Sequence, residues 1–198
     1  WPGRENRLSE PAMTDLALMQ DALESALPPF FDRPMALFGY SLGASIALEV
    51  ARRMVEHEVP PVHLFAAAAA APQLERRVQQ TTHLADDAFL EAIQQHFGGI
   101  PPEIAANPEL LQVVLPALRA DMTIIETNPY REGQPLPCPI TVIGGSEDAI
   151  VPLAELAAWR DLTRGAFTHR LYPGGHFFIR ERLAQVVRLV NERLDAGA

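Results

Sequence analysis

The sequence predicts an α/β fold with a mostly parallel, doubly wound sheet and a helical lid inserted between two strands. Short apolar segments alternate with segments of helical periodicity along most of the chain, which is typical of a parallel sheet covered by helices. Strand signals vanish from about Gln73 to Glu126, where amphipathic helical segments take their place. We therefore expect residues 1–198 to form a single domain, with a helical lid over about 73–126.

Each predicted element follows from a local pattern. Residues 14–27 place apolar side chains at helical spacing until Pro28 and Pro29 stop them. Residues 35–40, MALFGY, are apolar on both faces, which suits a strand buried in a parallel sheet. The other predicted strands are residues 62–68, 139–145 and 167–173. The other predicted helices are residues 41–58, 86–97, 108–126, 152–163 and 177–194.

Composition and charge exclude several classes of function. The formal net charge of -9 argues against nucleic-acid binding, which usually needs a basic face. The longest apolar run, from Val62 to Ala71, is too short to span a bilayer. The single cysteine, Cys138, cannot form an internal disulfide and offers no metal cluster, so we expect a reducing compartment, the cytoplasm. Because the chain begins with Trp1 instead of Met, we expect that an upstream segment is absent from it.

A serine lies between two glycines where the strand MALFGY turns into the next helix. In GYSLG, residues 39–43, Gly39 and Gly43 lack the Cβ atoms that would collide as strand and helix close together. We expect Ser41 to have a strained backbone and to hold its hydroxyl at the helix N-terminus, where amide groups favour an anion. GxSxG alone is a weak pattern, and a tight structural turn is the alternative. The strand before it and the helix after it favour a nucleophile.

A serine nucleophile needs a base, and that base needs an acid to orient it. Asp148 follows the strand PITVIGG and His176 follows the strand FTHRLYP, so both lie at the sheet edge where the Ser41 turn also lies. The chain order Ser, Asp, His is that of α/β-hydrolases. Glu147 is the main competitor for the acid role. The remaining histidines, on helices, on strand bodies or in the lid, are His57, His63, His83, His96 and His169.

Four segments together resemble type II thioesterases, the editing enzymes of nonribosomal peptide and polyketide synthases. They are LFGYSLGASIALEVARRM, LRADMTIIET, PITVIGGSEDAIVP and LYPGGHFFI, and WPGREN also resembles the family's PGR loop. The resemblance covers essentially the whole chain. It implies an α/β-hydrolase that cleaves acyl or aminoacyl thioesters from the phosphopantetheine arm of carrier proteins. It also implies Ser41 as nucleophile, His176 as base, Asp148 as its orienter and the Leu42 amide as an oxyanion donor, with no metal or cofactor.

Two departures from the family pattern lead to further expectations. Tyr40 stands where the family commonly has histidine before the serine, and we expect it to tune packing without abolishing the chemistry. The family's strand with a glycine-rich loop, which supplies the other oxyanion amide, is absent from this chain. Losing one such donor costs about 10²–10³ in rate. Residues 35–40 should therefore pair only with residues 62–68 and leave an apolar edge, which is an aggregation hazard.

The lid and the basic side chains leave alternatives open. The apolar stripe of the lid either covers an acyl channel or packs on the sheet; it includes Phe89, Ile93, Leu110, Val114 and Leu118. Carrier proteins are typically acidic, so arginines near the site are candidates for docking them, namely Arg76, Arg77, Arg131, Arg180 and Arg182. Other readings are a release or cyclising thioesterase domain, a general carboxylester hydrolase and a catalytically silent carrier-protein binding module.

Overall fold

The computed structural model describes residues 1–75, 79–128 and 130–196, and these form two compact units. Unit 1 comprises Trp1–Met19 and Arg77–Pro129, and unit 2 comprises Gln20–Arg76 and Tyr130–Ala198. Most of the helical block expected between the strands thus belongs to unit 1, and all strands belong to unit 2. The organisation as one domain with a lid over residues 73–126 stays a prediction.

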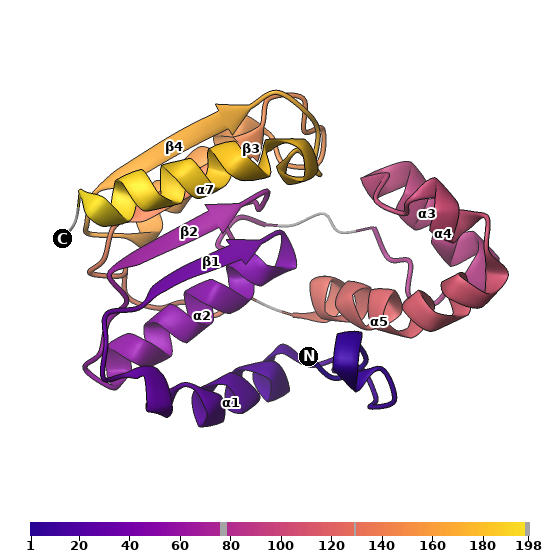
Figure 1. The fold of residues 1–198 in the computed structure, drawn as a ribbon, viewed down its shortest axis with the longest axis horizontal. Coiled ribbons are helices and arrows are strands. Elements are labelled where there is room, and N and C mark those ends of the chain that lie inside the picture. The colour runs from indigo at the N-terminus through magenta and orange to yellow at the C-terminus, as the bar shows by residue number, and fades with distance from the viewer. Residues whose placement is uncertain (76–78, 129, 197–198) are drawn as a thin grey trace. The chain divides into compact units, whose positions relative to one another are not determined.

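Unit 2 is built on a parallel four-stranded sheet in the order β1-β2-β3-β4 (Figure 1). The strands are β1 (Ala36–Tyr40), β2 (His63–Ala67), β3 (Ile140–Gly145) and β4 (Phe167–Tyr172). Every neighbouring pair is parallel, with Tyr40 opposite Ala67 and Gly145 opposite Tyr172 at the carboxyl ends. All four lie within one or two residues of the predicted segments, and the α/β class with a parallel sheet is confirmed.

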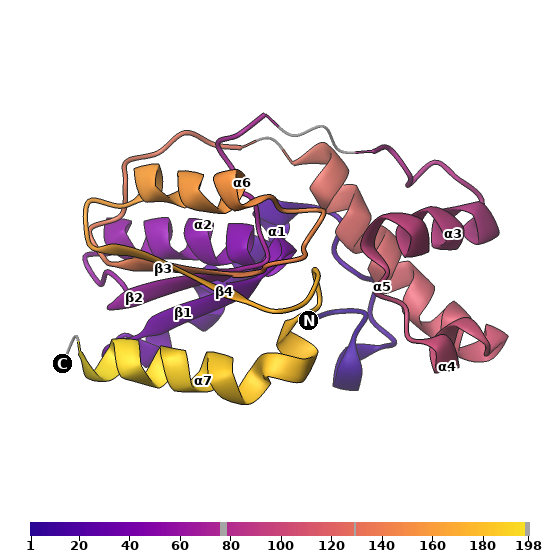
Figure 2. The ribbon, with the colours of Figure 1, turned by 90° about the horizontal axis from the view of Figure 1, so that it is seen from above.

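Helices cover both faces of this sheet (Figure 2). Helices α2 (Leu42–Glu56) and α6 (Leu153–Ala157) lie on one face, and α7 (Ile179–Asp195) lies on the other. Successive strand residues point to opposite faces, so Val142 joins the core beneath α2 and α6 while Ile143 joins the core beneath α7. The small side chains of α2, such as Ala44 and Ala51, are fully buried and let this helix lie close to the sheet.

Strand β1 forms one edge of the sheet. Among the described residues it pairs with β2 on one side and with no strand on the other. The Phe38 side chain is 43% exposed, which is unusual for a strand whose sequence is apolar on both faces. The expected unpaired edge is confirmed for the described residues, while poor solubility of the isolated chain stays a prediction.

The helix prediction is correct in outline and differs in detail. Helices α1 (Leu16–Ala26) and α3 (Asp86–Phe97) lie within the predicted ranges. The predicted helix over 152–163 is α6 followed by a 3-10 helix, η3 (Ala158–Leu162). Three short elements were not predicted: η1 (Glu5–Arg7), η2 (Pro28–Phe30) and α4 (Pro102–Ala105). These are one turn long, too short to show a hydrophobic period.

Unit 1 has a small core of its own between α3 and α5 (Pro108–Thr127). Phe89, Ile93 and Met122 are buried in it, and Leu118 packs against them. Of the predicted lid stripe, Phe89 and Ile93 therefore pack within the helical block itself, which neither sequence interpretation anticipated. Leu110 is 43% exposed. Hydrophobic periodicity indicates which face of a helix is apolar, but it does not indicate which partner covers that face.

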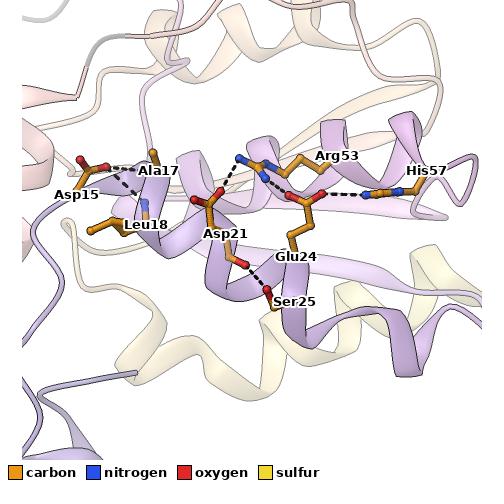
Figure 3. A network of polar contacts seen from close by, with 8 residues as sticks. All are labelled: Asp15, Ala17, Leu18, Asp21, Glu24, Ser25, Arg53 and His57. Carbon is orange, nitrogen blue, oxygen red and sulfur yellow. Dashed lines mark hydrogen bonds and ion pairs between the residues drawn. The ribbon is translucent and has the colours of Figure 1, made fainter.

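An ion-pair cluster joins α1 to α2 in unit 2 (Figure 3). Arg53 of α2 contacts Glu24 and lies 3.2 Å from Asp21, both of which are on α1. His57, at the end of α2, lies 3.0 Å from the same Glu24 carboxylate. The cluster ties the helix that follows the serine turn to the preceding helix.

In the part of the chain that the structure describes, no helix is both long and apolar enough to cross a bilayer.

Candidate active site

Ser41 occupies the single residue between β1 and α2. Its φ of 52° and ψ of -119° lie in a region that non-glycine residues rarely adopt, which is the strain expected of this turn. Two backbone hydrogen bonds hold the turn in place: the Ser41 N–H donates to the Ala67 carbonyl at 2.8 Å, and the Ala44 N–H donates to the Ser41 carbonyl at 3.0 Å. The serine is thus fixed to the end of β2 and to the first turn of α2.

The two glycines of GYSLG do not share one role. A Cβ atom on Gly39 would lie 2.2 Å from the Gly43 carbonyl oxygen and 2.5 Å from the Ala44 Cα, so only glycine fits there. A Cβ atom on Gly43 would meet nothing within 4 Å. The sequence expectation that both glycines prevent a collision is correct for Gly39 and wrong for Gly43. The close approach of β1 and α2 therefore requires glycine at position 39, on the strand, but not at position 43, in the helix.

His176 lies in a tight loop between β4 and α7. Gly174 in this loop has a φ of 124°, and the Phe178 N–H closes a turn by donating to the Gly175 carbonyl at 3.1 Å. The loop approaches the end of β3 closely, since a Cβ atom on Gly145 would lie 2.3 Å from the Gly174 oxygen. Gly145 is a positioning feature that the sequence analysis did not single out. The glycine pair that ends PITVIGG was the sequence signal that could have indicated this close approach.

Asp148 is held from both sides of its carboxylate. One oxygen, Oδ1, accepts hydrogen bonds from the backbone N–H groups of Ile150 at 2.8 Å and Val151 at 3.1 Å. The other, Oδ2, lies 2.9 Å from Nδ1 of His176. The Asp148 side chain is only 1% exposed. Burial acts to raise the pKa of this carboxyl, but the hydrogen bonds from His176, Ile150 and Val151 outweigh it and lower the pKa.

The imidazole of His176 joins the carboxylate to the serine. Its Nε2 lies 3.2 Å from Oγ of Ser41, and its side chain is 5% exposed. An ionised carboxylate only accepts hydrogen bonds, so Asp148 fixes the proton on Nδ1 and leaves the lone pair of Nε2 facing the serine hydroxyl. The structure therefore brings Ser41, His176 and Asp148 together in the order that nucleophilic acyl transfer requires.

The contact of Asp148 with His176 decides between the two candidate acids. Glu147 is exposed, and its backbone N–H donates to the Gly174 carbonyl at 3.0 Å. Asp148 makes the contact with His176. The other histidines lie elsewhere: the buried His63 is bonded to Thr141, the exposed His57 is bonded to Glu24, and His83, His96 and His169 are also exposed.

The predicted oxyanion donor is the first residue of α2. The Leu42 backbone N–H lies in the first helical turn, where amide groups have no acceptor within the helix. An anion beside Ser41 would meet this N–H together with the positive end of the helix dipole. The position of Leu42 suits the role, and the role itself stays a prediction.

Tyr40 makes a contact that the sequence analysis missed. Packing beside the nucleophile was the expectation, and its ring does lie edge-on to the His176 imidazole, with centroids 6.0 Å apart. In addition, its hydroxyl donates a hydrogen bond to the backbone carbonyl of His176. No sequence signal could have revealed this contact, because it joins residues 136 positions apart.

Of the predicted docking arginines that the structure describes, Arg180 packs on a ring that contacts His176. The guanidinium of Arg180 lies over the ring of Phe177, 4.7 Å from its centroid, and this ring is edge-on to His176. Arg131 is exposed, and its carbonyl accepts a hydrogen bond from Arg52. Arg182 is half-buried. Arg76 and Arg77 lie outside the described residues.

Comparisons with known proteins point to one family. The family model described as a thioesterase domain matches residues 1–194. The chain is 38% identical to linear gramicidin dehydrogenase LgrE of Brevibacillus parabrevis, covering 98% of this chain and 75% of that protein. It is 36% identical to thioesterase PikA5 of Streptomyces venezuelae, covering 98% and 69%. It also resembles the structure of the type II thioesterase BorB from the borrelidin biosynthetic cluster, with 31% identity, a TM-score of 0.86 and coverage of 98% and 77%.

Proposed function

Because the chain belongs to the thioesterase family, we propose that it edits nonribosomal peptide or polyketide synthases by hydrolysing acyl or aminoacyl thioesters on their carrier proteins. The observation that supports this most is the contact of His176 with both the Ser41 hydroxyl and the buried Asp148 carboxylate. The same proposal places the enzyme in the cytoplasm with its carrier proteins.

In the first half of the reaction the acyl group moves to the enzyme. Nε2 of His176 takes the proton of the Ser41 hydroxyl as Oγ attacks the thioester carbonyl carbon. The carbonyl oxygen becomes an oxyanion, and the Leu42 N–H stabilises it at the helix N-terminus. When the tetrahedral intermediate collapses, the carbon–sulfur bond breaks and the imidazolium returns its proton to the pantetheine sulfur. The products are a free thiol and an ester on Ser41.

In the second half, water releases the acyl group. His176 takes a proton from water as its oxygen attacks the ester carbonyl, and the collapse of the second intermediate returns that proton to Oγ of Ser41. The acid leaves and the enzyme is restored. Asp148 keeps the imidazole in the required tautomer and stabilises its cationic form during both halves. These residues carry every proton transfer that the reaction needs.

Arg180 is the best-placed described arginine for recognising the carrier. Carrier proteins are typically acidic, so local cations must provide the attraction in a chain with a net charge of -9. Arg180 lies in the first turn of α7, next to the His176 loop. Arg188 lies two turns along the same helix and is also exposed, so it is a matched control. At low salt, Arg180→Glu should raise KM for an acyl carrier protein but not for free acyl-pantetheine, and Arg188→Glu should change neither.

A hydrolysis assay tests the proposed activity directly. Acyl carrier protein, free acyl-pantetheine and a p-nitrophenyl ester are offered to the wild type and to Ser41→Ala. We expect the carrier-bound thioester to be hydrolysed fastest and the activity to be lost in Ser41→Ala. Preference for the oxygen ester would identify a carboxylester hydrolase instead. Binding of the carrier without turnover would identify a silent binding module, and a cyclised product would identify a release thioesterase.

A further inference from the structure

Contacts at both ring nitrogens and burial fix the side chain of His176, and a backbone hydrogen bond joins its loop to the segment that follows β3. Asp148 holds Nδ1, Ser41 lies at Nε2, and the ring is 5% exposed. The loop itself contains Gly174 and Gly175, which restrict the backbone less than any other residue. The N–H of Glu147, just after β3, donates to the Gly174 carbonyl, two residues before the histidine.

The Tyr40 hydroxyl provides an anchor at the histidine itself. Tyr40 is the last residue of β1, directly before the nucleophile, and its hydroxyl donates to the His176 backbone carbonyl. Its ring packs edge-on against the imidazole and lies tilted against the ring of Phe178, with centroids 6.0 Å apart. Burial, together with the charge of Asp148, raises the pKa of Tyr40, so the phenol stays protonated and keeps donating at working pH.

This hydrogen bond joins the two segments whose separation determines the reaction distance. Ser41 is bonded covalently to Tyr40, and the acceptor is the backbone of His176. The bond therefore acts on the 3.2 Å gap between Oγ and Nε2 without touching either atom. A misplacement of about 1 Å between reacting groups can cost about 10²-fold in rate.

We propose that Tyr40 is a positioning residue for the base, and that its hydroxyl holds the backbone of His176 at the distance from Ser41 that proton transfer requires. This inference rests on the proposed function, since it assumes that His176 acts as the base. The proposed role depends on the hydroxyl of Tyr40, whereas a role in packing alone would need only its aromatic ring.

Tyr172 offers a matched control in the same aromatic cluster. Its ring stacks on Phe178 with centroids 6.1 Å apart, and its hydroxyl donates to a backbone carbonyl, that of Gln185, at 3.2 Å. That acceptor lies in α7, away from the reacting atoms. Tyr40→Phe and Tyr172→Phe thus each remove one phenol bond to a backbone carbonyl, and each keeps the ring.

The experiment measures kcat, KM and the melting temperature of both variants with an acyl thioester. We expect Tyr40→Phe to lower kcat about 10-fold with KM unchanged, since binding does not depend on the distance between Ser41 and His176. Tyr172→Phe should match its melting temperature within a few degrees and keep the wild-type kcat. An unchanged kcat in Tyr40→Phe, or an equal fall in both variants, would overturn the proposal.

A second readout separates this inference from the proposed substrate. A fluorophosphonate reacts covalently with serines that have a working base, whatever their natural substrate. If the wild type is labelled but hydrolyses no thioester, the proposed function fails and the labelling rates still test Tyr40. Slower labelling of Tyr40→Phe than of Tyr172→Phe would then support its positioning role. Equal rates would contradict it.

Discussion

The two ends of the same parallel sheet each hold a buried histidine bonded to a hydroxyl. At the carboxyl end, Nε2 of His176 lies 3.2 Å from the Ser41 oxygen. At the amino end, Nε2 of His63 lies 2.8 Å from the Thr141 oxygen, which in turn lies 2.8 Å from that of Thr168. The two histidines are 7% and 6% exposed. Neither the hydrogen-bond length nor the burial distinguishes a candidate base from a structural histidine.

The difference lies in what surrounds each pair. His176 has the Asp148 carboxylate on its second nitrogen, and its serine occupies a strained turn at the N-terminus of α2. His63 has the Thr141 hydroxyl on its Nε2 and the ring of Phe65 stacked against its imidazole, and burial together with the charge of Arg193 lowers its pKa. A carboxylate stabilises an imidazolium, whereas burial and a cation oppose it. Only the carboxyl end can take up the proton of a hydroxyl.

The largest expected effect comes from replacing each histidine with glutamine. Losing the base of a serine hydrolase costs about 10⁴–10⁶ in kcat, so His176→Gln should lose nearly all activity. His63→Gln should keep kcat within a few-fold, because no reacting group contacts it. Steady-state hydrolysis of an acyl thioester by both variants checks this. Comparable losses of kcat in the two variants would contradict the distinction between a catalytic histidine at the carboxyl end and a structural one at the amino end.

Neutralising the carboxylate should have the next largest effect. Asp148→Asn keeps the side-chain volume but can place a donor against Nδ1, which favours the wrong tautomer of His176; a fall in kcat of about 10⁴ is expected. The control at the other end is Thr168→Val, which removes a hydrogen-bonding neighbour of Thr141. Its kcat should equal that of the wild type. If Asp148→Asn kept more than a tenth of the activity, another group would be the orienter.

The turn that presents the serine should respond unequally to its two glycines. Gly39→Ala places a Cβ atom 2.2 Å from a backbone oxygen, so a loss of about 4 kcal/mol or failure to fold is expected. Gly43→Ala meets open space within α2 and should change the free energy of unfolding by about 1 kcal/mol or less, in the stabilising direction. Urea titrations followed by circular dichroism measure both. Equal destabilisation by Gly39→Ala and Gly43→Ala would contradict the conclusion that only Gly39 is required at the turn.

The smallest expected effect is a pH dependence that differs between the ends. A lowered pKa in the folded state means that the unfolded chain binds a proton first as pH falls. The stabilising contribution of His63 is therefore complete well above about pH 6.5 and is lost progressively below it; that of Asp148 is lost only below about pH 4. His63→Gln should flatten the unfolding free energy between pH 7 and pH 5 and leave the lower window unchanged. If the unfolding free energy of His63→Gln fell between pH 7 and pH 5 as steeply as that of the wild type, His63 would not be the group responsible.

The sequence was informative where covalent connectivity or strand polarity determines position. Ser41, Asp148 and His176 each follow a strand of the parallel sheet, so strand prediction alone placed them at one edge. Gly39 was predictable for the same reason, because its neighbour across the turn is only a few residues away. The unpaired side of β1 followed from the resemblance to a family with a further strand there.

The sequence was silent where a contact depends on three-dimensional distance alone. The Tyr40 bond to His176 and the close approach of Gly145 to the His176 loop join segments far apart in the chain. The open space beside Gly43 could not be seen from a motif that contains both glycines. The packing of Phe89 and Ile93 within the helical block was not anticipated, since an apolar stripe does not identify what covers it.

The central claim is that the arrangement at the carboxyl end of the sheet makes Ser41 nucleophilic. Labelling with a fluorophosphonate, followed by mass spectrometry of the intact protein and its peptides, tests this without assuming a substrate. We predict one adduct per chain, on the peptide that contains Ser41, with no adduct in Ser41→Ala and much slower labelling in Asp148→Asn. A folded wild type that is not labelled, or a Ser41→Ala variant labelled at the wild-type rate, would contradict the claim.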